Sequence, residues 1–450
     1  MSKEKTDLAV ENEAPAASSS AKNGKSGFRN PWAWVPSLYY AEGIPYAIVM
    51  LVSVIMYKDM GISNTDITFY TAWLNLPWVI KPLWSPFLDM FRKKRSWIIS
   101  MQFLIGVGLA GVALTIPASA FFQYTIMFFF LLAFSSATHD IAADGFYMLG
   151  LDKHNQALYA GIRSTFYRIA MITAQGILVV IAGTLSKTMG VAGAWTIVFY
   201  IVTALFGLFA VYHFFMLPRP ASDKPAVVDG SGSVMKNFVK TFALFFQKNK
   251  IVLILAFLLT YRLGEALLLS LVAPFLKDPR ALGGLGLTTE QIGIVSGTVG
   301  VAGLLCGGII GGIFSARVGL GKALWWMFAA INLPAWVYVM LSFTQPESIY
   351  AICVAVGFEQ FCYGFGFTAY MLFMMYVCQG ELKTSHYSIA TGFMALSMMI
   401  PRMFAGKIED MLGYQTFFII AALAVVPAFL ITRMLPYDPD FGKKTAEDAK

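Results

Sequence analysis

The stretch Pro218-Arg-Pro-Ala-Ser-Asp-Lys-Pro225, followed by Gly230-Ser-Gly232, divides this sequence of 450 residues into two parts. Residues 218–250 form the only long polar connector between apolar segments. Proline and glycine at this density do not continue a helix, so the connector predicts a boundary between two structural units.

Each side of the connector contains six apolar segments. Each segment is long enough to cross a lipid bilayer as a helix, which takes about 20 residues. The predicted helices are 33–57, 66–88, 97–117, 122–150, 157–185, 191–216, 250–276, 289–315, 321–343, 347–378, 386–405 and 413–435. This pattern predicts an all-α membrane protein with twelve transmembrane helices in two six-helix bundles.

The composition indicates that the solvent is lipid. Hydrophobic residues make up 58% of the chain and charged residues 13%, about half the usual charged share of a soluble domain. These values exclude a disordered chain, a nucleic-acid-binding protein and a soluble enzyme. The four cysteines lie in or beside apolar segments without metal-ligand spacing, so we expect no metal site. No phosphate-binding loop is present, so we expect no ATP-driven pump and no cofactor.

The distribution of lysine and arginine predicts the orientation. If both termini are cytoplasmic, the inner loops and tails hold 23 of the 33 basic residues and the outer loops hold 5. Positive charge concentrates on the cytoplasmic side of membrane proteins, so this ratio places both termini inside. The predicted organisation is a disordered cytoplasmic tail, a six-helix bundle, a cytoplasmic linker, a second six-helix bundle and a cytoplasmic tail, at 1–32, 33–216, 217–249, 250–435 and 436–450.

Ionisable residues inside the predicted helices are the candidates for function, because each costs roughly 2.5–3.5 kcal/mol to insert. Carboxyl groups near mid-depth can load and release protons at ordinary pH. The proton-coupling candidates are Glu42, Asp140, Asp144, Glu265 and Glu359. The substrate-binding candidates are His139, Arg168, Arg262, Gln360, Tyr363, Tyr370 and Arg402.

The densest cluster of charge lies in the fourth and fifth predicted helices. Asp140 and Asp144 are four residues apart and share one helical face. Depth counted at 1.5 Å per residue pairs Asp144 with Arg163 and Asp140 with Arg168. Both pairs could be structural, or the deeper pair could line a cavity.

Three further features are expected near the helix ends. We expect the long aliphatic side chain of Lys81 to place its ammonium group at the membrane interface. Arg402 could either bind an anionic substrate or extend to the interface in the same way. We expect Asp89, Arg92 and Arg95, around the short second loop, to act in gating. The alternative for this basic loop is a topological role alone.

Six plus six helices with a cytoplasmic central loop is the layout of the major facilitator superfamily. The chain also resembles the AmpG muropeptide permease family of that superfamily, which is related to acetyl-coenzyme A transporters. The segments that carry this resemblance are Tyr40-Ala-Glu-Gly-Ile-Pro45, Lys81-Pro-Leu-Trp-Ser-Pro-Phe-Leu-Asp89, Ser136-Ala-Thr-His-Asp-Ile-Ala-Ala-Asp144, Tyr167-Arg-Ile-Ala-Met171, Tyr261-Arg-Leu-Gly-Glu-Ala266 and Gly286-Leu-Thr-Thr-Glu-Gln-Ile-Gly293.

The resemblance implies proton-driven import of muropeptides, which are N-acetylglucosamine joined to anhydro-N-acetylmuramic acid with or without peptide, across a bacterial inner membrane. The expected partners are this solute, protons and the lipid bilayer, and we expect a monomer. The chain departs from the family pattern at Glu42, at His139 and at Phe146-Tyr147. Two alternatives remain open: a carrier for another sugar, oligosaccharide or acyl-coenzyme A, and a membrane-embedded enzyme that uses the aspartates of the fourth helix.

Overall fold

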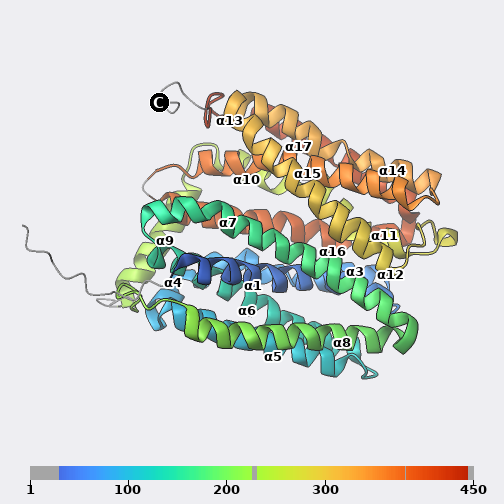
Figure 1. Ribbon diagram of the computed structural model, residues 1–450. Coiled ribbons are helices and arrows are strands. Elements are labelled where there is room, and N and C mark those ends of the chain that lie inside the picture. Colours follow the sequence, from blue (N-terminus) through green and yellow to red (C-terminus); the bar gives the residue numbers. More distant parts are fainter. Residues whose placement is uncertain (1–29, 226–230, 381, 444–450) are drawn as a thin grey trace, which may run out of the picture.

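The computed structural model describes residues 30–225, 231–380 and 382–443 (Figure 1). Within these ranges all regular secondary structure is helical, which confirms the predicted all-α class. The predicted tail 1–32 lies almost wholly outside the described residues. Residues 444–450 of the predicted tail 436–450 also lie outside the described residues.

The N half comprises the elements before the linker. They are η1 (Pro31–Ala33), α1 (Val35–Ala47), η2 (Ile48–Val52), α2 (Ser53–Asp59), α3 (Asn64–Trp73), α4 (Leu76–Phe91), α5 (Lys94–Thr115), α6 (Phe121–Gly150), α7 (Lys153–Met171), η3 (Ile172–Leu178) and α8 (Val179–Met216). The linker contains one described helix, α9 (Ser231–Phe246).

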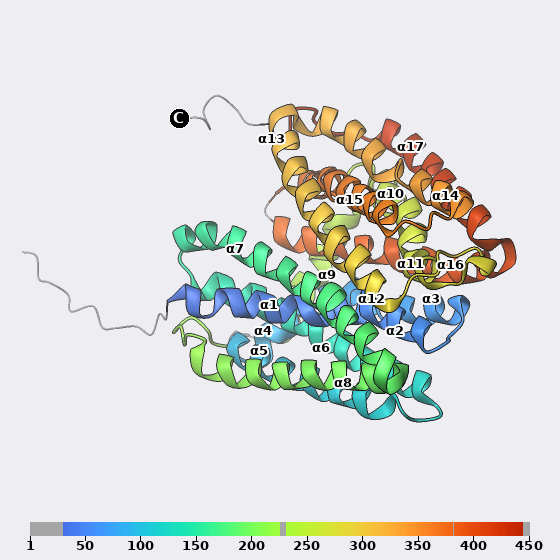
Figure 2. The same cartoon turned by 45° about the vertical axis from the view of Figure 1, so that its right-hand side comes forward.

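The C half comprises the elements after the linker. They are α10 (Ile251–Thr260), α11 (Leu263–Lys277), η4 (Arg280–Leu282), α12 (Thr289–Ile292), η5 (Gly293–Gly300), α13 (Val301–Asn332), α14 (Ala335–Thr344), α15 (Ile349–Val377), α16 (Lys383–Leu423) and α17 (Val425–Met434). Figure 2 shows the two halves as two groups of helices, one above the other.

Three of the long helices bend back on themselves at a glycine. Gly190 in α8, Gly319 in α13 and Gly413 in α16 all have φ near 75° with an extended ψ. This backbone region is open almost only to glycine. Each of these glycines therefore ends one membrane-crossing segment and starts the next.

The described helices are consistent with the twelve predicted spans. Eight continuous stretches are long and apolar enough to cross a membrane. Three of them, 161–216, 289–344 and 385–434, contain the three glycine bends and therefore cross twice. The pair α3–α4 supplies the remaining crossing.

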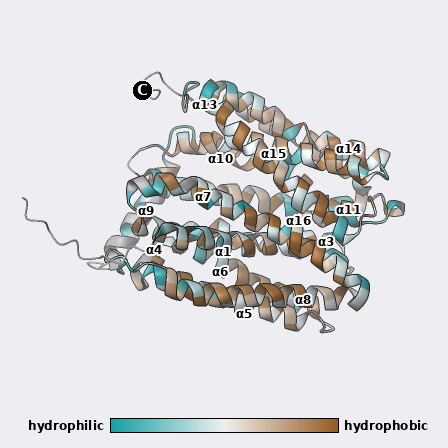
Figure 3. Ribbon diagram, viewed as in Figure 1, coloured by the Kyte–Doolittle hydropathy of each residue, from teal (hydrophilic) through white to brown (hydrophobic). Residues whose placement is uncertain are grey.

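Large apolar side chains cover the outside of the bundle, as lipid requires. Phe103 and Leu114 of α5 and Val354 of α15 are each more than 60% exposed. Figure 3 shows hydrophobic residues along the lengths of the helices and hydrophilic ones gathered towards the helix ends. Water would disfavour such a surface, whereas acyl chains solvate it.

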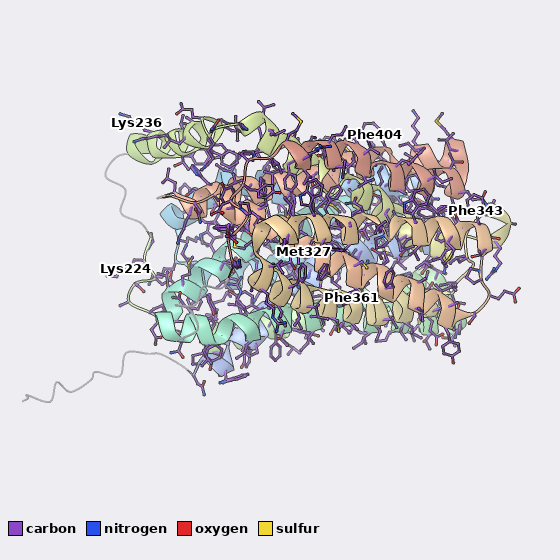
Figure 4. All side chains as sticks on the ribbon, turned by 90° about the horizontal axis from the view of Figure 1, so that it is seen from above. Lys224, Lys236, Met327, Phe343, Phe361 and Phe404 are labelled. Atoms are coloured by element: carbon purple, nitrogen blue, oxygen red, sulfur yellow. The ribbon has the colours of Figure 1, made fainter. Side chains whose placement is uncertain are left out.

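The two ends of the bundle differ. We call the end where α1 begins and α17 ends the terminal end, and the opposite end, with the turn between α2 and α3, the far end (Figure 1). Lys224 and Lys236 of the linker lie at the terminal end, opposite Phe343 of α14 at the far end (Figure 4).

The apolar core is shared between the halves at the far end and divided at the terminal end. One cluster joins residues of both halves, among them Tyr57 of α2 and Phe275 of α11. At the terminal end, Phe146 of α6 belongs to a cluster of the N half, and Phe257 of α10 belongs to a separate cluster of the C half. The halves are therefore packed most tightly together at the far end.

Candidate functional site

The N half holds a cluster of five ionisable side chains from four helices. The Lys81 ammonium of α4 donates to the Asp140 carboxylate of α6. Arg163 Nη2 of α7 lies 2.8 Å from Asp144 Oδ1 of α6, which confirms that predicted pair. Glu42 of α1 lies beside the Asp140 carboxyl group. Three carboxyl groups thus share two cations.

The segment around Glu42 explains how this cluster forms. A Cβ atom on Gly43 would lie 2.8 Å from the Tyr167 carbonyl oxygen and 2.8 Å from Ala170 Cβ. Glycine therefore lets α1 and α7 pack closely. Tyr39, one turn before Gly43, donates its hydroxyl to Asp144 Oδ1 at 3.2 Å, and the Arg163 guanidinium lies over the Tyr39 ring.

The predicted pair of Asp140 with Arg168 is wrong, because Lys81 binds Asp140 instead. Depth counting considered the α6–α7 hairpin alone, whereas α4 also packs against α6. Lys81 points inward to this carboxylate rather than outward to the interface. Arg168 lies towards α13 of the C half, where its Nη2 is 3.8 Å from the position of a Cβ on Gly308.

The C half holds a compact ion pair at a break in a helix. Arg262 separates α10 from α11, with φ −103° and ψ 12°. Its Nε and Nη2 donate to the two carboxylate oxygens of Glu265 at 2.9 and 2.6 Å. Nη2 also donates to the Tyr363 hydroxyl at 3.0 Å, and the guanidinium lies over the Phe367 ring. Discontinuous helices often form the binding sites of transporters.

Arg402 of α16 lies where the halves meet. Its Nη2 donates to the carbonyl oxygen of Met50 in η2 at 3.3 Å. Its Nε is buried and has no hydrogen-bond partner among the described residues. Arg402 therefore bridges the halves rather than reaching the membrane interface.

Several predicted site residues lie inside one half instead of at the interface between halves. His139 is fully buried and hydrogen bonds through Nε2 to Gln102. Tyr370 is fully buried and donates to the Leu258 carbonyl oxygen. The carboxyl group of Glu359 accepts from the Tyr338 hydroxyl at 3.4 Å and from Gln360 Nε2 at 2.9 Å, also within the C half.

The predicted gating loop is attached to the linker. Asp223 accepts the backbone N–H groups of Lys94 and Arg95, at 2.8 and 3.1 Å. A carboxylate at this position stabilises the start of α5, where the first N–H groups have no partner in the helix. Arg92 is exposed. The side chain of Asp89 lies outside the described part of the structure.

The far end contains contacts that the sequence analysis missed. Lys277 Nζ of α11 lies 2.6 Å from Asp59 Oδ1 of α2, and Lys58 Nζ lies 2.6 Å from Asp278 Oδ1. Each aspartate also accepts a hydrogen bond from the first residue of a helix in the other half. Thr289 of α12 donates to Asp59 at 2.7 Å, and Asn64 of α3 donates to Asp278 at 3.3 Å. An aromatic donor completes each set, Trp195 for Asp59 and Tyr414 for Asp278. We call these two sets the far-end latches.

A close backbone contact also joins the halves at the far end. A Cβ on Gly297 in η5 would lie 2.2 Å from the Gln175 carbonyl oxygen of η3. Likewise, a Cβ on Gly183 of α8 would lie 2.4 Å from the backbone nitrogen of Glu290 in α12. Only glycine permits this approach between the segments.

The geometry is that of two helical halves joined at one end, with paired charges at mid-depth in each. Residues 37–406 match the family model of the major facilitator superfamily. The chain belongs to the major facilitator superfamily. It is therefore a multi-pass membrane transporter, and the alternative of a membrane-embedded enzyme is wrong.

Relatives and a solved structure agree with this assignment. A relative in Rickettsia conorii, named as transporter AmpG 4, is 26% identical over 405 residues, covering 88% of this chain and 94% of the relative. The anhydromuropeptide permease of Escherichia coli K12 is 26% identical over 402 residues, covering 88% of this chain and 77% of that protein. The crystal structure of a D-xylose-proton symporter superposes with a TM-score of 0.69 at 10% identity, covering 92% of this chain and 99% of that one. The resemblance to the AmpG family is confirmed.

Proposed function

We propose that this protein imports muropeptides across the bacterial inner membrane together with protons, by alternating access and as a monomer. The substrate is N-acetylglucosamine joined to anhydro-N-acetylmuramic acid, with or without peptide. The similarity to the E. coli anhydromuropeptide permease, over 88% of this chain, is the observation that carries this proposal.

Both termini then lie in the cytoplasm, in agreement with the 23 basic residues of the inner loops and tails. The far-end latches face the periplasm in this orientation. With this orientation, the two latches and the shared apolar core at the far end support a state closed towards the periplasm. Periplasmic substrate enters when these contacts separate.

Glu42 is the residue that we assign to proton coupling. Lys81 and Arg163 compensate Asp140 and Asp144, and Glu42 makes no ion pair among the described residues. Its Oε2 atom is buried and has no hydrogen-bond partner in the part of the chain that the structure describes. A buried carboxylate without a cation is strongly disfavoured, so Glu42 holds a proton in this state. Its carboxyl then donates to Asp140, and exposure to water on the cytoplasmic side releases the proton.

The test is uptake of radiolabelled N-acetylglucosaminyl-anhydro-N-acetylmuramic acid into proteoliposomes. An inwardly directed proton gradient should drive accumulation above the outside concentration, and an uncoupler should abolish accumulation while exchange continues. Xylose, a nucleoside and an acyl-coenzyme A serve as competitors. Transport of one of these instead of the labelled disaccharide would contradict the muropeptide assignment, and accumulation driven by sodium alone would contradict the proton assignment.

A further inference from the structure

Arg402 lies at the junction of the two halves and forms no ion pair with a carboxylate of the described residues. Among the described residues its guanidinium donates to the Met50 carbonyl oxygen at 3.3 Å, and its Nε is buried without a partner. The titratable group that acts on it is the phenol of Tyr46 in α1. An arginine in a protein is always charged, so this cation needs an anion or water.

The charges inside the bundle do not cancel by pairing. Three ion pairs form there: Lys81 with Asp140, Arg163 with Asp144 and Arg262 with Glu265. Away from the far end, where the buried Glu409 also lacks an ion pair, two carboxyl groups and two arginines of the described interior residues form no ion pair. These four are Glu42, Glu359, Arg168 and Arg402.

The unpaired carboxyl groups and the unpaired arginines behave differently. Glu42 and Glu359 can become neutral by holding a proton, whereas Arg402 and Arg168 cannot lose their charge. The interior therefore keeps an excess of positive charge whenever the two carboxyl groups are protonated. An anionic solute removes that excess.

The neighbouring arginine of the C half shows what a satisfied guanidinium looks like. Arg262 donates two parallel hydrogen bonds to Glu265, and an aromatic ring covers one face. Its Nε and Nη2 are occupied by Glu265 and the Tyr363 hydroxyl. Arg402 has the same chemical group without the carboxylate.

The backbone beside Arg402 is also irregular. Met50 lies in η2, a π-helical turn within the first membrane-crossing segment. Such turns occur frequently at functional sites. Arg402 therefore rests against an irregular turn of the N half, at a contact between the halves, with its Nε buried and without a partner among the described residues.

We propose that Arg402 is the binding site for a carboxylate of the substrate, with Tyr46 as the neighbouring hydroxyl donor. This inference rests on the proposed function and specifies its substrate class as anionic. The lactyl carboxylate of a peptide-free muropeptide, or a carboxylate of the peptide, forms the paired hydrogen bonds that Arg402 lacks. Arginine presents a planar fork that matches a carboxylate.

The test compares binding of two probes to the purified full-length protein in detergent by calorimetry. One probe is N-acetylglucosaminyl-anhydro-N-acetylmuramic acid, and the other is the same disaccharide with its carboxylate converted to a carboxamide. We expect the acid to bind about tenfold or more tightly than the amide, since only the carboxylate is an anion that accepts two parallel hydrogen bonds from the guanidinium. R402Q should reduce the affinity for the acid to that of the amide and leave the amide unchanged.

Lys407→Gln is the matched control, because it removes one positive charge from an exposed position of the same helix. It should keep the preference for the acid. R402K, which keeps the charge and loses the planar fork, should retain part of the preference and serves if R402Q fails to fold.

Each outcome decides the matter. Equal affinity of the unmodified protein for acid and amide would overturn the role of Arg402 and leave muropeptide transport intact, without any variant. An acid preference that survives in folded R402Q would also overturn it. Failure of both probes to bind would overturn the proposed function together with this inference.

Discussion

Lys277 of α11 binds Asp59 of α2 at 2.6 Å, and the neighbouring residues repeat the bond in reverse, with Lys58 at 2.6 Å from Asp278. The same Lys-Asp dipeptide thus ends the first membrane-crossing segment of each half. Each lysine binds the aspartate of the other half, which is the reciprocal pattern expected across a two-fold axis. The two halves are related by such an axis along the membrane normal in this superfamily.

Asp59→Asn should weaken the closure of the far end. The substitution leaves Lys277 without its carboxylate. Because the Asp59 side chain is buried, breaking this ion pair costs more free energy than breaking an ion pair on the surface. We expect the closed population to fall about tenfold relative to the open one, which corresponds to about 1.4 kcal/mol. Double electron–electron resonance spectroscopy with spin labels on α2 and α12 would detect the longer distance between the two halves.

Two comparisons make this latch test specific. Asp440→Asn removes an exposed ion pair at the terminal end, with Lys443 at 3.1 Å, and should change no distance at the far end. The exchange Asp59→Lys with Lys277→Asp should restore closure. An unchanged distance distribution in Asp59→Asn would show that the latch does not hold the halves together.

Gly297→Ala should hinder the approach of the two halves through a steric clash. The new Cβ would lie 2.2 Å from the Gln175 carbonyl oxygen, so η3 and η5 must separate. Gly312→Ala on α13 is the control, because a Cβ there meets no atom within 4 Å. We expect a transport rate reduced about tenfold or more for Gly297→Ala and an unchanged rate for Gly312→Ala. Equal rates in the two variants at equal abundance would contradict the close contact.

The sequence predicted the fold because lipid imposes a simple rule. Backbone groups in a bilayer must be satisfied within a helix, so long apolar segments identify the spans and a polar connector separates the bundles. The sharp bends at Gly190, Gly319 and Gly413 were not predicted as hinges, although each lies at or near the end of a predicted helix. Glycine in a membrane helix has several uses, and sequence alone does not distinguish a hinge from a packing site.

The partners of the buried charges were less predictable. The pair of Asp144 with Arg163 follows from depth in one hairpin, whereas the partner of Asp140 depends on how α4 packs and rotates beside α6. The far-end latches were missed because their lysines were treated only as outer-loop charges. Their repeated Lys-Asp dipeptide is a signal that the sequence does contain.

Asp140→Asn should reduce the amount of folded protein. The change leaves the Lys81 ammonium without its carboxylate inside the N half. The two side chains are 24% and 22% exposed, so the cost is below the about 3–5 kcal/mol typical of a fully buried ion pair. The double variant Lys81→Met with Asp140→Leu should recover abundance, because it removes both charges. Quantitative fluorescence size-exclusion chromatography measures the folded fraction.

Arg168→Gln separates the two possible partners of Asp140. It should leave abundance close to normal, because the structure gives Arg168 no ion pair with Asp140. Loss of folded protein in Arg168→Gln, with normal folding in Lys81→Met, would contradict the pairing of Lys81 with Asp140.

Glu42→Gln should separate transport from proton coupling. Glutamine resembles the protonated carboxyl in size and hydrogen bonding, so the N-half cluster keeps its two ion pairs and its neutrality. We expect exchange of labelled disaccharide at a rate within about threefold of the unmodified protein, because the exchange step needs no change in protonation. Accumulation driven by a proton gradient should be lost.

Glu359→Gln is the comparison, since Tyr338 and Gln360 already satisfy that carboxyl group within the C half, and it should keep gradient-driven accumulation. Accumulation that persists in Glu42→Gln and fails in Glu359→Gln would move the coupling site to the C half.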